Sequence, residues 1–203
     1  SVTAVAVDIT NKTVTLTLGS TITNADTVTV NYTPNANKLQ DVAGNLAVAL
    51  TTQPVTNNSA DTTPPAAPTL DLVDASDSGT VNTDDKTNVV NPTIRVTFTG
   101  TGVTAPVAGD TVVLKADGTT QVATAVLSSA DIALGHIDLV TSTLATGTRS
   151  LTATITDAAN NTSAASTALP ITIDTTAPAL ASATVNGTSL VLTYTEVGVG
   201  LLN

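Results

Sequence analysis

Residues 61–66 read DTTPPA, and residues 174–179 read DTTAPA. Neither segment can form a central β-strand, because proline has no amide hydrogen to donate and holds the chain extended. Each is therefore interpreted as an interdomain linker. The two linker aspartates, Asp61 and Asp174, stand 113 positions apart, which is enough for a small β-sandwich of roughly 100 residues. The repeated segment thus predicts one complete domain over residues 61–175.

The stretch between the linkers alternates apolar and polar residues, as half-buried strands do. Two runs place every second side chain on one face, Ile94, Val96 and Phe98 in the first and Leu151, Ala153 and Ile155 in the second. Seven strands are predicted, near residues 67–73, 92–99, 111–115, 120–127, 137–140, 149–156 and 164–173. Seven short strands in a domain of this size are typical of an immunoglobulin-like β-sandwich.

A long polar stretch, from Asp74 to Asn91, separates the first two of these strands. It is rich in Asp, Ser, Thr and Asn, and it exceeds an ordinary connection, whose median length is about 4–6 residues. Long loops held by a rigid scaffold often carry function. We therefore expect a functional loop here.

The flanking segments carry strands, but too few for a sandwich each. Residues 1–60 contain four predicted strands. Residues 181–195 predict a hairpin around Asn186-Gly187, a dipeptide favoured in two-residue turns. A two-stranded hairpin is at best marginally stable in water. We interpret residues 1–60 as the C-terminal part of one sandwich repeat and residues 176–203 as the N-terminal part of a following one, so that the two ends are complementary.

The composition favours an all-β protein of tandem sandwiches and excludes several classes of partner. Thr and Val are abundant, the only aromatics are two Tyr and one Phe, and Cys, Met and Trp are absent. The formal net charge of −10 removes the electrostatic basis for binding nucleic acid or anionic lipid. No apolar run approaches the roughly 18–20 residues that span a bilayer. We expect no nucleic-acid partner and no membrane insertion.

Short motifs in all three parts of the chain resemble repeats of bacterial surface proteins. The central motifs are Asp77-Ser-Gly79, Thr83-Asp84, Thr156-Asp157-Ala-Ala-Asn160 and Ile173-Asp-Thr-Thr-Ala-Pro178. The flanking motifs are Val28-Thr-Val-Asn-Tyr-Thr33, Leu39-Gln-Asp-Val-Ala-Gly-Asn45 and Asn186-Gly-Thr-Ser-Leu-Val-Leu-Thr-Tyr-Thr-Glu196. The centre resembles the bacterial Ig-like repeats of giant biofilm-associated, type I secreted adhesins. The flanks resemble the ending and the opening of repeats named after the cyanobacterial swimming-motility surface protein.

This resemblance implies an extracellular protein or a rod on the bacterial cell surface. Such rods serve adhesion, biofilm cohesion or motility, and their domain junctions bind Ca²⁺. The implied partners are neighbouring repeats or copies of the same protein, including a possible homopolymer. One departure is Asn160-Asn161, where such repeats commonly carry Gly-Asn.

The strand order predicts where oxygen ligands for Ca²⁺ gather. In an immunoglobulin-like sandwich, the N-terminus shares one end with the loop before the last strand, while the loop after the first strand lies at the other end, beside the outgoing chain. The predicted ligands of the first junction are Asp61, Asp157 and Asn160, with Asp26 from the preceding segment. Those of the second are Asp77, Asp84, Asp85 and Asp174, with Glu196 from the following segment. Calcium takes six to eight such oxygens.

Turn capping is the alternative role of these aspartates. Of the 16 acids, 15 are Asp, whose side chain hydrogen-bonds nearby backbone amides in turns. Solubility and turns account for about half of the Asp residues on this interpretation. The repeated linker favours Ca²⁺ for the residues around it.

Catalysis is not expected. His136 is the only histidine, so no zinc site of the usual His and Cys ligands can form. No nucleophile-elbow sequence accompanies it. His136 is interpreted as a surface or strand-edge residue.

Three functions remain open at this point. The first is a spacer whose calcium-stiffened junctions project a distant tip. The second is a self-assembling filament subunit, in which residues 179–203 of one copy are completed by residues 1–57 of another. The third is a direct glycan- or protein-binding adhesin, which the scarcity of aromatic residues disfavours.

Overall fold

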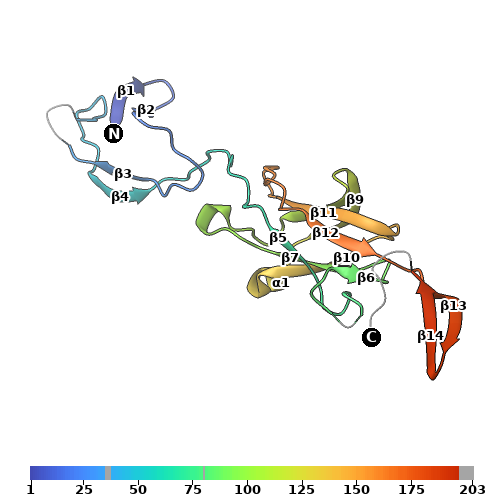
Figure 1. Cartoon of the computed structure of the whole chain (residues 1–203). Coiled ribbons are helices and arrows are strands. Elements are labelled where there is room, and N and C mark those ends of the chain that lie inside the picture. The colour runs from blue at the N-terminus through green and yellow to red at the C-terminus, as the bar shows by residue number, and fades with distance from the viewer. Residues whose placement is uncertain (35–37, 80, 197–203) are drawn as a thin grey trace. The chain divides into compact units, whose positions relative to one another are not determined.

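A computed structural model describes residues 1–34, 38–79 and 81–196 (Figure 1). It divides into two compact units, Ser1–Thr62 and Thr63–Asn203. Nearly all of the regular structure is β-strand, so the predicted all-β class is confirmed. In the described residues, no helix is long and apolar enough to cross a membrane.

Unit 1 consists of two small antiparallel sheets. Strand β1 (Val2–Asp8) pairs with β2 (Thr13–Leu18), and β3 (Thr29–Tyr32) pairs with β4 (Leu50–Pro54). These are the four strands predicted before residue 58. None of the described residues of this unit is buried. Unit 1 therefore has strands but no closed core among the residues described.

Unit 2 contains a two-sheet sandwich. One sheet has the strand order β10-β7-β5, and the other has the order β6-β12-β11-β8-β9. The strands are β5 (Thr69–Leu72), β6 (Lys86–Thr87), β7 (Thr93–Thr97), β8 (Thr111–Ala116), β9 (Thr120–Val126), β10 (His136–Val140), β11 (Gly147–Thr156) and β12 (Leu169–Ile173). All neighbouring strands are antiparallel except β6 and β12, which are parallel.

The core of the sandwich follows the predicted alternation. In β7, Ile94 and Val96 are fully buried, and Phe98 packs partly buried just beyond the strand end. In the facing sheet, β11 buries Leu151, Ala153 and Ile155. Further buried apolar residues are Leu72, Val112, Leu114, Ala116, Val122, Leu127, Leu139, Leu144, Ile171 and Ile173. Burial of this apolar surface is the main force that closes the sandwich.

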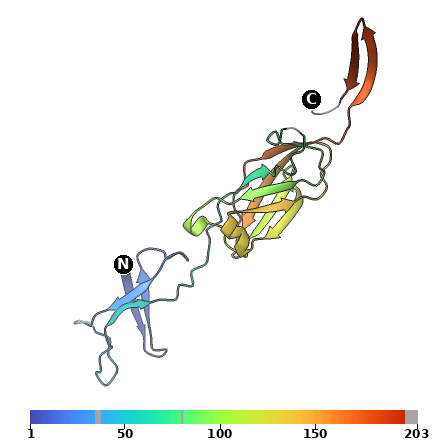
Figure 2. The ribbon, with the colours of Figure 1, turned by 90° about the horizontal axis from the view of Figure 1, so that it is seen from below.

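Three features of unit 2 differ from the prediction. The polar stretch after β5 is not a plain loop, because it contains β6. The last strand begins at Leu169 and not near residue 164. A short helix, α1 (Ser129–Leu134), lies between β9 and β10, at the end of the sandwich opposite the chain's exit from β12 (Figure 2). Its capping box of Ser128 and Asp131 needs only a few residues, too few for a helical pattern in the sequence.

A final antiparallel hairpin follows the sandwich. Strand β13 (Ala179–Asn186) pairs with β14 (Ser189–Thr195) across the predicted Asn186-Gly187 turn. Every residue of both strands is exposed. The predicted C-terminal part runs to residue 203, and its residues 197–203 lie outside the described part of the chain.

Candidate functional site

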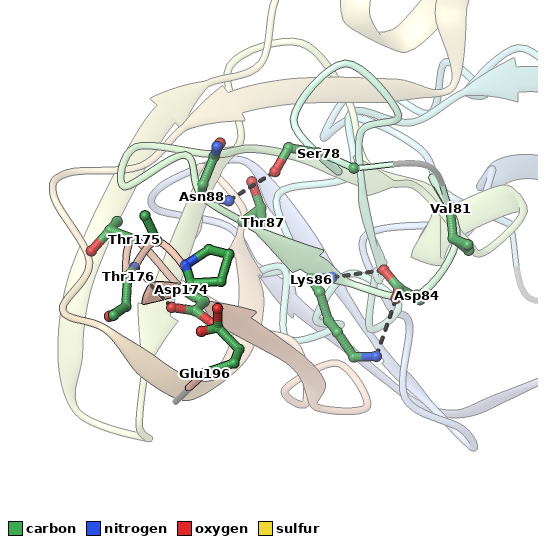
Figure 3. Close-up of a pocket in the computed structure, with 13 residues that line it drawn as sticks. Ser78, Val81, Asp84, Lys86, Thr87, Asn88, Asp174, Thr175, Thr176 and Glu196 are labelled. Atoms are coloured by element: carbon green, nitrogen blue, oxygen red, sulfur yellow. Dashed lines mark hydrogen bonds and ion pairs between the residues drawn. The ribbon is translucent and has the colours of Figure 1, made fainter. Parts of the chain in front are cut away.

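The candidate site is a pocket of about 440 Å³ in unit 2, at the end of the sandwich where β12 ends (Figure 3). Residues from the 78–88 stretch line it together with the linker residues that follow β12 and with Glu196. The parallel pairing of β6 with β12 joins the first two segments, and the Asp174 amide donates to the Thr87 carbonyl at 2.8 Å. Asp84, Asp174 and Glu196, all predicted ligands, therefore share one pocket.

A lysine competes for one of these carboxylates. The Asp84 carboxylate lies 3.1 Å from the Lys86 ammonium, and both side chains are partly exposed (Figure 3). The other Asp84 oxygen accepts from the Lys86 amide at 3.3 Å. Sequence reasoning overlooked Lys86, although residues two apart on an extended segment point to the same side.

Asp77 lies directly before this pocket lining and is buried, with only 4% of its surface exposed. Its Oδ2 accepts from the Asp85 amide at 3.2 Å. Its Oδ1 has no hydrogen-bond partner among the described residues. A buried carboxylate oxygen without a donor or a cation destabilises the folded state, so Asp77 carries a buried, unsatisfied acceptor in this loop.

The same loop concentrates negative charge. Burial raises the pKa of Asp85, and the nearby carboxylates of Asp77, Asp71 and Asp84 raise it further. The backbone of Asp85 has a positive φ of 57°, a conformation that Asp tolerates better than most residues. The loop therefore holds its carboxylates against mutual repulsion.

These groups do not converge on one point. Within residues 1–34, 38–79 and 81–196, no three His, Cys, Asp or Glu side chains are grouped closely enough to hold a metal ion. Asp77 and Asp85 also lie outside the pocket lining. The structure thus brings three predicted ligands into one pocket without assembling a complete coordination shell.

At the other end of the sandwich, Asp157 caps a turn. Its Oδ1 accepts from the amides of Ala159 and Asn161, both at 2.8 Å, and its Oδ2 accepts from the Asn161 side chain at 2.9 Å. The Asn161 side-chain bond is the main cause that lowers the pKa of Asp157. This is the capping role that the sequence left open as the alternative.

The remaining predicted ligands of the first junction belong to both units of the chain. Asp26 caps its own turn in unit 1, because its Oδ2 accepts from the amide and hydroxyl of Thr23. Asp61 belongs to unit 1, whereas Asn160 belongs to unit 2, where it adopts a positive φ of 68°. The first calcium junction stays a prediction.

The profile of the bacterial Ig-like domain matches residues 62–175, more than half of the chain. The chain belongs to the bacterial Ig-like domain family. This confirms the resemblance of the centre and the immunoglobulin-like class of its sandwich. Asp77, Asp84, Asp85, Asp157, Asn160 and Asp174 all lie within the matched Ig-like domain.

A second family matches both flanks of the Ig-like domain. The profile of a flagellar system-associated repeat matches residues 1–37 and 173–199, the former containing Asp26 and the latter Asp174 and Glu196. The predicted arrangement of one family at the centre and another at both ends is confirmed. By their descriptions, neither is an enzyme family. A search of curated proteins found no match.

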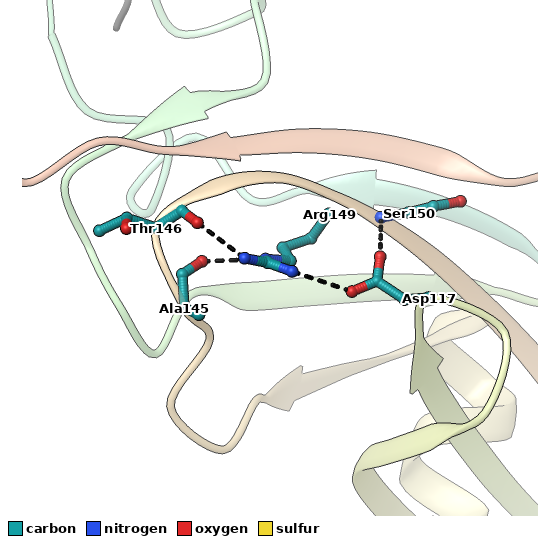
Figure 4. A network of polar contacts seen from close by, with 5 residues as sticks. All are labelled: Asp117, Ala145, Thr146, Arg149 and Ser150. Carbon is teal, nitrogen blue, oxygen red and sulfur yellow. Dashed lines mark hydrogen bonds and ion pairs between the residues drawn. The ribbon is translucent and has the colours of Figure 1, made fainter. Parts of the chain in front are cut away.

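The Ig-like domain contains two further polar groups that sequence reasoning did not single out. Asp110, directly before β8, is almost fully buried, and its Oδ1 has no hydrogen-bond partner among the described residues. Arg149 joins three loop groups at the same end of the sandwich as the pocket: the carbonyls of Ala145 and Thr146, and the carboxylate of Asp117 at 3.1 Å (Figure 4). A lone polar residue at a strand end looks like an ordinary turn residue, so neither group had a signal in the sequence.

Proposed function

We propose that this chain is a non-catalytic structural segment of an extracellular or cell-surface bacterial protein that serves adhesion, biofilm cohesion or motility. On this proposal, Ca²⁺ stiffens the junction between the Ig-like domain and the repeat that follows it. The observation that supports the proposal is the shared pocket. Asp84 comes from the Ig-like domain, Asp174 from the linker and Glu196 from the end of the next hairpin.

The donor chemistry fits calcium. Carboxylate oxygens are its preferred protein ligands, and the pocket and the adjoining loop offer several of them. The unpartnered, buried Oδ1 of Asp77 and the raised pKa of Asp85 both indicate negative charge that a divalent cation would offset. An ion held by Asp84, Asp174 and Glu196 would cross-link three segments and reduce their relative motion.

Lys86 is the group that calcium has to displace. Its ammonium takes one oxygen of Asp84, so binding requires this carboxylate to turn away from the lysine. An exposed pair of this kind contributes only about 0–1 kcal/mol, so breaking it costs little free energy compared with the binding free energy of a calcium site.

Thermal unfolding with and without calcium tests the proposal. A ligand at 100 times its dissociation constant stabilises a folded protein by about 2.7 kcal/mol, which corresponds to roughly 5–11 °C for a unit of this size. Calcium should raise the unfolding temperature of unit 2, and a chelator should reverse this. An unfolding temperature that is the same in millimolar Ca²⁺ and in chelator contradicts the proposal.

Two pairs of variants locate the ion. Asp174→Asn and Glu196→Gln should each reduce the calcium-induced shift, because each removes a charged ligand of the pocket. Asp8→Asn, which removes a turn-capping carboxylate of unit 1, is the matched control and should leave the shift unchanged. Lys86→Gln should tighten calcium binding about 3–10-fold by removing the competing charge. The two variants that lose a carboxylate ligand should instead bind calcium more weakly.

A second candidate function is assembly into filaments. The observation that favours it is the exposure of large apolar residues in both segments matched by the repeat profile, including Val5, Leu16, Leu190 and Leu192. Large exposed apolar patches are typical of interaction sites. Negative-stain electron microscopy of the concentrated chain should then show regular fibres, and uniform single particles contradict a filament.

A further inference from the structure

The hairpin β13–β14 has one apolar face without a cover. Its cross-strand pairs on this face are Val185 with Leu190, Ala183 with Leu192, and Leu180 with Tyr194. The opposite face carries Thr184, Ser182 and Thr193, with Val191 as its one large apolar residue. Because side chains alternate between faces, the apolar residues form one continuous stripe. Leu192 is 46% exposed and Val185 is 75% exposed, so the described residues of unit 2 do not bury this stripe.

The hairpin β1–β2 has the same construction. Its apolar pairs are Val7 with Val14, Val5 with Leu16, and Val2 with Leu18. Its other face carries Ala4, Ala6, Thr15 and Thr17. Both hairpins have an irregularity in the register of the first strand, between Val2 and Ala4 in one and between Leu180 and Ser182 in the other. Two hairpins in one chain thus present matching stripes of three apolar pairs.

Neither stripe can remain exposed at low cost. A two-stranded hairpin needs a third strand or a packed face for independent stability. The described residues of unit 1 include none that is buried. The Ig-like sandwich, which lies between the two hairpins in the sequence, has its own closed core. No charged side chain lies in either stripe, so stacking the two faces buries no unpaired charge.

One repeat profile matches both segments, and this indicates which surface covers each apolar stripe. The matching stretches are residues 1–37 and 173–199, so both carry parts of the same kind of repeat. Segments of such a repeat that each expose an apolar face are expected to cover one another, as the two sheets of a sandwich do at a spacing of about 10 Å.

We propose that the apolar stripe of β13–β14 in one copy of this chain packs face to face on the β1–β2 stripe of a second copy, forming one sandwich from two molecules. The contact is heterologous, because each copy contributes a different surface. The dimer then retains one free stripe of each kind, β1–β2 on one copy and β13–β14 on the other, so association can continue from either end. The proposal rests on the second candidate function and names its contact surfaces.

Two full-length variants, each lacking one stripe, test the pairing. Leu16→Asp places a charge in the β1–β2 stripe and leaves β13–β14 intact. Leu192→Asp does the reverse. By sedimentation velocity, the wild type should associate as its concentration rises, and each variant alone should remain monomeric, with association weakened at least about 100-fold by the buried charge. Mixing the variants should give a 1:1 heterodimer that grows no further.

The mixture remains informative even if one substitution unfolds its own hairpin. The heterodimer uses only β13–β14 of the Leu16→Asp variant and only unit 1 of the Leu192→Asp variant. Thr15→Asp and Thr193→Asp, on the opposite faces of the same strands, are the matched controls and should keep wild-type association within about 3-fold. An unchanged melting transition of the Ig-like domain verifies that the variants are otherwise folded.

Several outcomes overturn the pairing. A mixture that stays monomeric at concentrations where the wild type associates excludes it. So does self-association of either single variant, which would indicate a stripe that pairs with its own kind. A monomeric wild type with slowly exchanging β13–β14 amides would mean that the hairpin is covered within its own chain. If the mixed variants form heterodimers but the wild type forms no fibres, the pairing stands and only the filament is rejected. The calcium-induced shift is measured independently, on unit 2.

Discussion

Ser163 and Ser166 replace a strand that the sequence predicts near residue 164. Each serine contacts one β11 residue twice: its amide donates to the carbonyl, and its hydroxyl accepts from the amide, at 2.8–3.0 Å. Ser163 holds Ile155 in this way, and Ser166 holds Ala153. The hydroxyls supply the acceptors that a regular strand would supply with its carbonyls. The backbone groups of β11 are therefore satisfied, although β12 begins only at Leu169.

Removing either hydroxyl should destabilise the Ig-like domain. Ser163→Ala or Ser166→Ala leaves a buried β11 amide without an acceptor, which costs about 1–3 kcal/mol. Chemical denaturation measures the free energy of unfolding. Thr167→Ala, at an exposed position in the same segment, is the control and should change it by less than about 0.5 kcal/mol. Equal stability of all three variants would show that the hydroxyls contribute nothing.

Asp85, in contrast to these serines, destabilises the folded state, because the fold disfavours its charge. Burial and the neighbouring carboxylates raise its pKa above the ordinary value, so its ionised form is penalised in the folded state. The penalty is fully present above the folded pKa. It fades as the pH falls through that value, and it is absent below the unfolded pKa of about 3.9, where both states are protonated.

Asp85→Asn should therefore stabilise the calcium-free protein at pH 7. Asn also tolerates the positive φ at this position, so the backbone is not strained further. The gain should shrink as the pH falls toward 4, since the wild type then loses its own penalty. Denaturation in chelator at both pH values measures this. A variant that is less stable than the wild type at pH 7, or a gain that does not depend on pH, contradicts the assignment to charge.

At the scale of elements, loops at the pocket end are tied to strands by a few polar anchors. Asp117, in the turn between β8 and β9, accepts from the Ser150 amide at 3.1 Å and pairs with Arg149. Arg149 also binds the two carbonyls before β11 (Figure 4). The planar guanidinium can satisfy three acceptors at once, which fixes the turn and the start of β11 relative to each other.

Arg149→Lys should lower the free energy of unfolding by about 1 kcal/mol, because a single ammonium cannot reproduce the fork. Arg95→Lys is the matched comparison, since among the described residues the Arg95 side chain binds only the Asp138 carboxylate, at the surface. That change should cost less, because exposed ion pairs contribute little to stability. A larger loss at Arg95 than at Arg149 would refute the anchoring role.

At the scale of the whole molecule, stability should be distributed unevenly. The Ig-like domain has a closed core around Ile94, Val96 and Leu151, whereas the described residues of unit 1 and both strands of the β13–β14 hairpin include none that is buried. Local opening is governed by how much apolar surface and how many protected hydrogen bonds a segment has.

Native-state hydrogen exchange checks this distribution. In dilute solution, amides of β7, β8 and β11 should exchange slowest, and those of β1, β2, β13 and β14 should exchange orders of magnitude faster. Protection of the two hairpins should rise with protein concentration if a second copy covers them, while the core amides of the Ig-like domain stay unchanged. Uniform protection along the dilute chain would contradict the division into a stable sandwich and weakly protected flanks.

Local signals along the chain predicted the elements well. Alternation in β7 and β11 indicated the sandwich, and the Asn186-Gly187 turn indicated the hairpin, because each depends on the geometry of a few neighbouring residues. The Asp157 turn illustrates the same rule. Its hydrogen bonds repeat those of Asp41 in unit 1, and Asn160 takes the positive φ that Gly44 takes there. The departure from Gly-Asn therefore leaves the turn intact.

What the sequence determined by itself was the all-β class, the family at the centre and at both ends, and the set of aspartates around the linkers. The tertiary structure decided which of them meet. Pairing of β6 with β12 brought Asp84 to Asp174, turn capping used the oxygens of Asp157, and Lys86 entered the pocket. Such meetings depend on strand order and on competition between donors far apart in the chain. Spacing along a sequence does not contain that information.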